Sequence, residues 1–172
     1  MVLGGPRSAT TWAANWLTTD TTFCLHDPLL EYTKRQLDLM TIPGRRIGIA
    51  CTSSILFPEW VLKHPAKKIV LFRDVDEINR SLEALGLPAL DGPAHYKRVK
   101  VLTDAKISLH YWEGVFDKME AGVIWQNLIG TPFDPWRHDL LTTFNVQPHF
   151  RRLPVSKDAV VDLVQRTKEV TV

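Results

Sequence analysis

The stretch Lys68-Ile69-Val70-Leu71-Phe72-Arg73-Asp74 contains the clearest strand in the sequence. Its four successive apolar residues are typical of a strand that is buried on both faces, as in a parallel sheet. Asp74 is a suitable N-cap for a helix predicted over Val75–Leu85, because acidic residues follow in the first turn and Gly86 ends the pattern. A buried strand followed at once by a capped helix predicts one βα unit of a parallel α/β fold.

The same alternation of short β-rich runs and longer helical patterns extends outward in both directions. Further strands are expected at Val2–Leu3, Thr21–Leu25, Arg46–Ala50 and Gly122–Gln126. Further helices are expected at Thr10–Thr19, Pro28–Met40, Pro58–His64, Ala94–Glu120, Trp136–Phe144 and Ser156–Thr167. The longest of these is predicted from an apolar stripe that core packing explains, formed by Leu102, Ala105, Leu109, Trp112, Phe116 and Met119. The sequence therefore predicts a three-layer α/β/α fold with a mainly parallel sheet, in a single domain over residues 1–172.

Composition excludes several classes of protein. The 172 residues are 45% hydrophobic and 23% charged, which suits one globular domain. A formal net charge of +2 gives no argument for a nucleic-acid or membrane partner. Cys24 and Cys51 are expected to be reduced core residues, and the sequence has no metal-ligand spacing such as CxxC, so no metal is predicted. Since neither a signal-peptide pattern nor an apolar run of about 18 residues occurs, a cytoplasmic protein is expected.

Small and hydroxyl-bearing residues follow the first predicted strand, in Gly4-Gly5-Pro6-Arg7-Ser8-Ala9-Thr10-Thr11-Trp12. Such a turn exposes backbone N–H groups at a helix N-terminus and therefore suits an anion. Against the nucleotide P-loop pattern GxxxxGK[ST], Thr10 stands where the lysine is required. The missing lysine argues against ATP or GTP hydrolysis and favours another phosphate-bearing ligand. The alternative is a Gly-Pro turn before a threonine-capped helix, without any ligand.

Two motifs resemble the sulfotransferases. Residues Pro6–Trp12 match that family's loop P-[KR]-S-G-T-[TS]-[WL] except at Ala9, where the family prefers glycine. The segment from Arg73 to Ser81 is similar to the family's R-[DN]-P-x5-S segment, with Val75 in place of the proline. Without a ligand, an Arg-Asp pair after a strand would be a helix cap or an ion pair. The resemblance covers residues 1 to about 85, roughly half of the chain.

The resemblance implies a cofactor and roles for individual residues. The cofactor is 3′-phosphoadenosine 5′-phosphosulfate (PAPS), and adenosine 3′,5′-bisphosphate (PAP) is the product. Arg73 and Ser81 would bind the 3′-phosphate. The 5′-phosphosulfate would lie in the loop, with Arg7 also stabilising the departing oxygen and Trp12 flanking the adenine. The loop residues that the resemblance assigns to cofactor binding are Pro6, Arg7, Ser8, Ala9, Thr10, Thr11 and Trp12.

A general base is also needed near the acceptor. The second predicted strand leads into His26-Asp27-Pro28, and ligands of open α/β sheets lie at the carboxyl ends of strands. Several sulfotransferase branches place a glutamate at the end of this strand, and this sequence has none there. Asp27 and His26 are the leading candidates for the base, followed by Glu31, although Asp27 before a proline is also typical of a helix N-cap.

The expected function is that of an enzyme, a sulfotransferase that moves the sulfuryl group of PAPS to a hydroxyl or amine. The acceptor would be a small molecule, a carbohydrate or a peptide, and the protein could be an oligomer. Two alternatives remain open. One is a small P-loop nucleotide or nucleoside kinase, which would need magnesium, and the other is a non-catalytic PAP-binding or assembly protein of the same fold.

Overall fold

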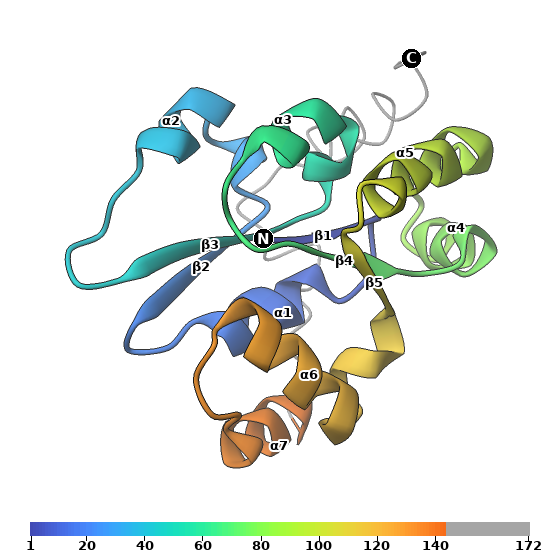
Figure 1. Cartoon of the computed structure of the whole chain (residues 1–172). Helices are drawn as coiled ribbons and strands as arrows, with labels where there is room; N and C mark the ends of the chain where they lie inside the picture. The colour runs from blue at the N-terminus through green and yellow to red at the C-terminus, as the bar shows by residue number, and fades with distance from the viewer. Residues whose placement is uncertain (144–172) are drawn as a thin grey trace.

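A computed structural model describes residues 1–143 and contains a five-stranded sheet (Figure 1). The strands are β1 (Val2–Gly4), β2 (Thr22–His26), β3 (Arg46–Cys51), β4 (Ile69–Phe72) and β5 (Ser108–Tyr111). Their order in the sheet is β2-β3-β1-β4-β5, and every neighbouring pair is parallel. The predicted α/β class with a parallel sheet is confirmed.

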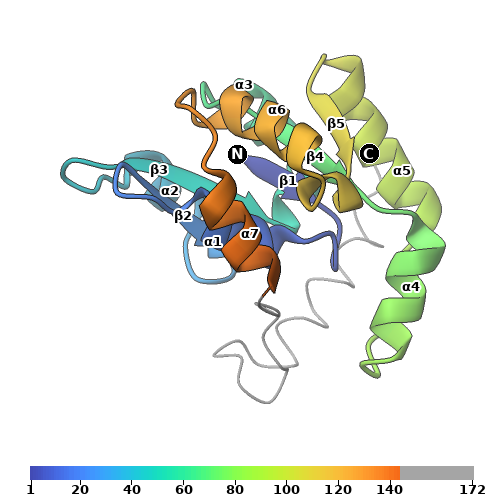
Figure 2. The same cartoon turned by 90° about the horizontal axis from the view of Figure 1, so that it is seen from below.

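Helices cover both faces of this sheet (Figures 1 and 2). One face carries α2 (Lys34–Leu39), α3 (Pro58–Lys63) and α5 (Gly92–Asp104), whereas α4 (Val75–Glu83) extends past the carboxyl end of β4. The other carries α1 (Thr10–Leu17), α6 (Lys118–Leu128) and α7 (Pro135–Thr143). Three short 3-10 helices connect these elements: η1 (Pro28–Leu30), η2 (Ser53–Leu56) and η3 (Trp112–Val115).

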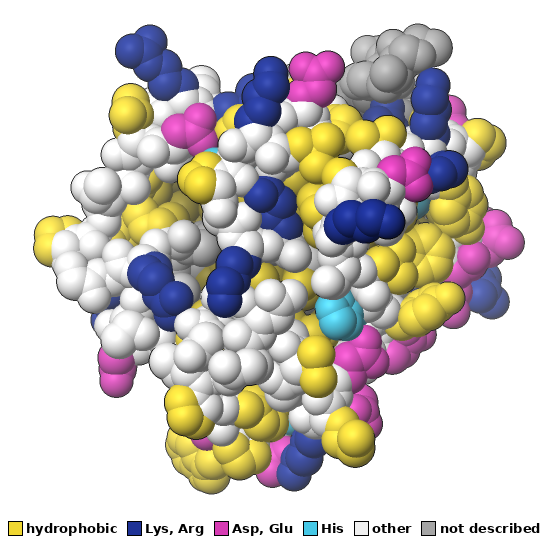
Figure 3. Space-filling model, viewed as in Figure 1, with side chains coloured by type: hydrophobic (Ala, Val, Ile, Leu, Met, Phe, Trp, Pro, Cys, Tyr) yellow, Lys and Arg dark blue, Asp and Glu magenta, His cyan; other side chains and the backbone are white. Residues whose placement is uncertain are grey.

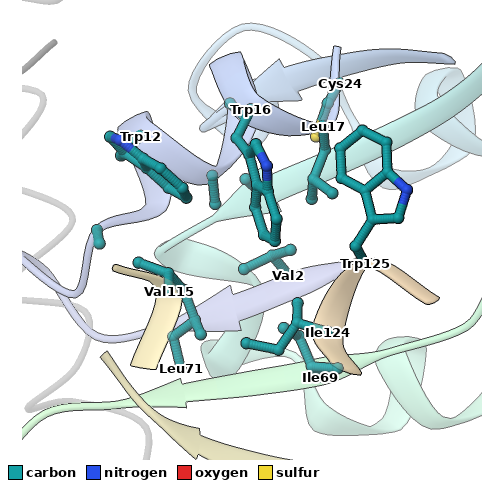
Figure 4. Packing of buried hydrophobic residues seen from close by; sticks show 14 of the residues in the cluster. Val2, Trp12, Trp16, Leu17, Cys24, Ile69, Leu71, Val115, Ile124 and Trp125 are labelled. Atoms are coloured by element: carbon teal, nitrogen blue, oxygen red, sulfur yellow. The ribbon is translucent and has the colours of Figure 1, made fainter. Parts of the chain in front are cut away.

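The alternation of side chains along the central strands divides the core in two. Val2, Ile69 and Leu71 join the cluster beneath α1 and α6, where Trp12, Trp16 and Trp125 also pack (Figure 4). The intervening residues Leu3 and Val70 face the other side and pack against η2, α3 and α5. Because both faces of β1 and β4 are buried, these strands are apolar throughout, as their sequence predicts.

The predicted long helix Ala94–Glu120 is wrong. Helix α5 ends at Asp104, and Lys106 adopts a left-handed backbone with φ 65°, which redirects the chain into β5. The residues of the predicted apolar stripe do not share one environment, since Leu102 is fully buried whereas 84% of Met119 is exposed. A periodicity that spans four different elements was therefore coincidental.

The predicted strand Gly122–Gln126 is also wrong, because these residues belong to α6. The Asp117 side chain accepts hydrogen bonds from the backbone N–H groups of Met119 and Glu120 and caps this helix. Ala121, Ile124 and Trp125 are buried at helical spacing. The cap and this spacing outweigh the β-branched pair that suggested a strand.

Two other predicted helices change their bounds. The expected helix Pro28–Met40 is divided into η1 and α2, because Thr33 starts α2 with a capping box that includes Gln36. The helix predicted over Trp136–Phe144 is observed as α7, whereas the one predicted over Ser156–Thr167 lies outside the described residues.

The connections that follow β1 and β4 leave the sheet in different directions. After β1 the chain crosses by α1 on one face toward β2, and after β4 it crosses by α4 and α5 on the other face toward β5. Neighbouring strands whose connections leave in opposite directions leave a gap between their ends, and open α/β sheets bind ligands there. The two motifs that the sequence analysis expects to bind phosphate follow these two strands.

Candidate functional site

The loop between β1 and α1 lies tightly against the sheet and its neighbouring helices. A Cβ atom on Gly5 would lie 2.9 Å from His95 Cε1 and 3.0 Å from Ile78 Cδ1, so a larger residue does not fit. His95 is itself 2% exposed, and burial lowers its pKa to about 4. The neutral imidazole of His95 therefore packs against Gly5 and supports the loop.

The loop contains two left-handed residues that are not glycine. Arg7 has φ 65° and Ala9 has φ 59°. Residues other than glycine adopt this left-handed region only where the surrounding structure holds them in it. Ala9 is the position where the sulfotransferase loop has glycine, and the positive φ gives a physical reason for that preference.

The N-terminus of α1 has donors suited to an anion. Ala9 is its N-cap and supplies no side-chain cap. The hydroxyl of Ser8 is fully buried and has no hydrogen-bond partner among residues 1–143. Buried polar groups normally have a partner, so Ser8 and the uncapped helix end fit a ligand that accepts hydrogen bonds.

The two motifs, far apart in the sequence, are joined by side chains. Arg7 Nε donates to Ser81 Oγ at 3.0 Å, and Arg73 Nη1 donates to the backbone oxygen of Arg7 at 2.7 Å. Burial and the neighbouring Arg73 lower the pKa of the Arg7 guanidinium. Two cations held this close repel one another, and an anion near both would relieve that repulsion.

Arg73 is held in place on three sides. Besides the Arg7 oxygen, it contacts Glu77 Oε2 at 3.1 Å through Nε, and its guanidinium lies 4.3 Å from the centre of the Trp112 ring. An open hollow of about 490 Å³ borders this arginine, and its lining residues are Arg73, Glu77, Arg80, Ser81, Trp112 and Glu113. The hollow therefore places two arginines, two glutamates, a hydroxyl and an indole at the carboxyl end of β4.

Trp12 does not occupy the position expected of a residue that flanks an adenine. It is 2% exposed, its Nε1 donates to the Leu141 oxygen, and its ring packs against Trp16 and Phe116. Since α1 turns this side chain toward the sheet, Trp12 is a core residue, as Figure 4 shows. The expectation that it flanks the adenine is corrected.

His26 and Asp27 lie side by side, and each is hydrogen-bonded to one threonine. His26 Nε2 lies 3.0 Å from Thr11 Oγ1 and 3.2 Å from Asp27 Oδ2. Asp27 Oδ1 accepts hydrogen bonds from both the backbone N–H and the hydroxyl of Thr52. The cluster thus connects the ends of β2 and β3 to the first turn of α1, whereas no hydrogen bond within residues 1–143 links Glu31 to it.

The sequence did not identify three residues of this region. Thr52 was overlooked because its contact with Asp27 depends on the pairing of β2 with β3. Trp112 was assigned to the apolar stripe of a helix that does not form. Arg80 directly precedes Ser81, and this proximity was a signal that could have drawn attention to it.

Charge elsewhere on the described surface is mixed. On the face shown in Figure 3, basic, acidic and hydrophobic side chains are interspersed rather than gathered into one field. Among residues 1–143, no group of three or more His, Cys, Asp or Glu side chains is arranged to hold a metal ion. Within the same residues, each helix is too short or too polar to span a bilayer.

Comparison with known proteins identifies no relative, since no family model, curated protein or solved structure matches the chain.

Proposed function

We propose that this chain binds PAPS at the carboxyl ends of β1 and β4 and transfers its sulfuryl group to an acceptor hydroxyl or amine. The observation that carries the proposal is the hydrogen bond from Arg7 to Ser81, which connects the 5′-phosphosulfate motif to the 3′-phosphate motif. A ligand with phosphate groups on the 3′ and 5′ oxygens of one ribose needs two such motifs side by side.

The residues present offer hydrogen-bond donors to both phosphate groups. On the 5′ side, Ser8 offers a buried hydroxyl without a partner, and α1 offers an uncapped N-terminus. On the 3′ side, Arg73 and Ser81 line the hollow together with Arg80. Guanidinium groups suit phosphate because they donate several hydrogen bonds in a fixed plane.

The remaining parts of the proposal concern catalysis. Arg7 would stabilise the charge that develops on the departing phosphate oxygen. His26 or Asp27 would accept the proton of the acceptor. Within this proposal the fold is of the P-loop type, with Thr10 in place of the lysine used by kinases, and the cytoplasm is the expected compartment.

Titration calorimetry with PAP, 5′-AMP, ADP and ATP tests the binding step. We expect PAP to bind at least tenfold more tightly than 5′-AMP or ADP, because one charge-assisted contact is worth about 1.5–3 kcal/mol. Binding should not require magnesium, whereas a kinase would bind ATP best in its presence. Equal affinities for PAP and 5′-AMP would contradict the assignment of a 3′-phosphate site.

Two variants locate the 3′-phosphate contact. Ser81→Ala and Arg73→Ala should each weaken PAP binding more than 5′-AMP binding, and Arg35→Ala, at an exposed arginine of α2, serves as the control. If Arg73→Ala acted only by releasing the loop, both ligands would lose affinity equally. Transfer of labelled sulfate to a panel of acceptors then separates an enzyme from a non-catalytic PAP-binding protein.

A further inference from the structure

The side chain of Asp27 is oriented by Thr52. Asp27 has φ 43°, its backbone N–H donates to the Ala50 oxygen, and its carboxyl group accepts two hydrogen bonds from Thr52, that of the hydroxyl at 2.9 Å. The carboxyl side chain is 14% exposed, and Thr52 is buried. Asp27 Oδ1 thus accepts both hydrogen bonds from Thr52, and Oδ2 is the carboxylate oxygen that lies near His26.

The position of this carboxylate determines which nitrogen of His26 carries the proton. A carboxylate accepts hydrogen bonds and cannot donate them. Asp27 Oδ2 lies 3.2 Å from His26 Nε2, so the negative charge of the carboxylate favours a hydrogen on that nitrogen over a lone pair. Nε2 therefore carries the hydrogen, and it donates that hydrogen to Thr11 Oγ1 at 3.0 Å.

Two consequences follow for the neighbouring groups. Thr11 receives a hydrogen bond on its oxygen, so its own hydroxyl hydrogen is available to another acceptor. Nδ1 of His26 retains its lone pair, and no residue of the described chain hydrogen-bonds to it. The His26 side chain is 31% exposed, so a molecule outside the protein can reach this nitrogen.

We propose that Thr52 and Asp27 are positioning residues that fix the Nε2–H tautomer of His26, which makes Nδ1 the proton acceptor and turns the Thr11 hydroxyl toward the 5′-phosphate. The inference rests on the proposed function and selects His26 over Asp27 as the base. PAPS supplies the sulfuryl group: as the acceptor oxygen bonds to sulfur, the bond from sulfur to the bridging phosphate oxygen breaks and its electron pair stays on the phosphate. His26 Nδ1 takes the proton that the acceptor hydroxyl loses.

The tautomer is measured directly by long-range ¹H–¹⁵N correlation spectra of ¹⁵N-histidine-labelled protein, with His26→Gln used for assignment. We expect Nε2–H in the wild type and Nδ1–H in Asp27→Asn, because the amide nitrogen of asparagine would then donate to Nε2. Asparagine also tolerates the left-handed backbone of this position. Thr52→Val should yield a mixture of tautomers, and Thr52→Ser should restore Nε2–H. An Nδ1–H tautomer in the wild type would overturn the inference.

Binding of PAP gives a second readout that requires no acceptor. Removal of a negative charge alone should strengthen anion binding, and Glu31→Gln, at an exposed acid nearby, serves as that control. Asp27→Asn should instead weaken PAP binding by roughly tenfold, because the Thr11 hydroxyl turns to Nε2 and is lost to the phosphate. Thr11→Val should weaken binding similarly in the wild type and have little further effect in Asp27→Asn.

The two proposals fail in different ways. If the wild type shows the Nε2–H tautomer but does not bind PAP, the proposed function is wrong. If PAP binds and Asp27→Asn binds it as tightly as Glu31→Gln does, the orientation of Thr11 by this chain of hydrogen bonds is wrong, while the PAP site stands.

Discussion

Replacement of Ala9 by glycine should cost almost no stability, unlike the same replacement at Ala14. Both alanines are almost completely buried, with 4% and 3% of their surface exposed, and both belong to the same core cluster. They differ in backbone conformation, because Ala9 has φ 59° whereas Ala14 lies within α1. The pair therefore isolates the cost of the left-handed conformation.

The expected free energies follow from this difference. Ala14→Gly loses about 1 kcal/mol of helix propensity and about 0.8 kcal/mol for the buried methyl group, roughly 2 kcal/mol in total. Ala9→Gly loses the same methyl group and about 0.5–1 kcal/mol of unfolded-state entropy. Relief of about 1–2 kcal/mol of left-handed strain offsets these losses, so its net change should lie within about 1 kcal/mol of zero.

Urea denaturation followed by circular dichroism measures both variants against the wild type. The two free energies of unfolding should differ by about 1–2 kcal/mol, which corresponds to melting temperatures that differ by roughly 2–8 °C for a chain of this size. Equal destabilisation by the two variants would refute the reasoning, because it would mean that Ala9 carries no conformational strain. The loop geometry at the centre of the proposed site would then be in doubt.

Two further predictions concern residues that support α1 and the loop. Arg137 donates hydrogen bonds to the backbone oxygens of Asn15, Trp16 and Thr18 at the C-terminal end of α1. Arg137→Met should therefore lower the free energy of unfolding by about 2–4 kcal/mol. Arg137→Lys should recover only the roughly 0.3–1 kcal/mol that a positive charge contributes at the C-terminal end of a helix. A loss below about 0.5 kcal/mol for the methionine variant would contradict this prediction. His95 has a folded pKa of about 4, below its unfolded value of about 6.5, so the unfolded chain binds its proton first as pH falls. The free energy of unfolding should keep its full value above pH 6.5 and decrease by roughly 3 kcal/mol toward pH 4. If the free energy of unfolding of a His95→Gln variant decreases equally steeply, another group is responsible.

The central part of the fold could be predicted from the sequence because its elements carry local information. The apolar run of β4 and the Asp74 cap of α4 determine their own conformations. Strand β5, in contrast, has the sequence Ser108-Leu109-His110-Tyr111 and is largely exposed at the edge of the sheet. Its conformation depends on pairing with β4, which no local pattern indicates.

The candidate site divides in the same way. The loop and the pair Arg73 and Ser81 could be selected as candidates from the sequence, because each lies within a short motif. The contact between Arg7 and Ser81 depends on how α4 packs beside the loop after β1, and that between Asp27 and Thr52 depends on strand order. The spacing of residues along the sequence determines neither of these two contacts. It also does not determine the direction in which the Trp12 ring points.

The location of Trp112 provides an optical probe of the site. Trp12, Trp16 and Trp125 are sealed in the core, so their emission should change mainly when the protein unfolds. Trp112 lies under the guanidinium of Arg73 at the edge of the hollow. Any molecule that draws this guanidinium away alters the electric field at the indole, so emission from Trp112 should report occupancy while the core tryptophans remain constant.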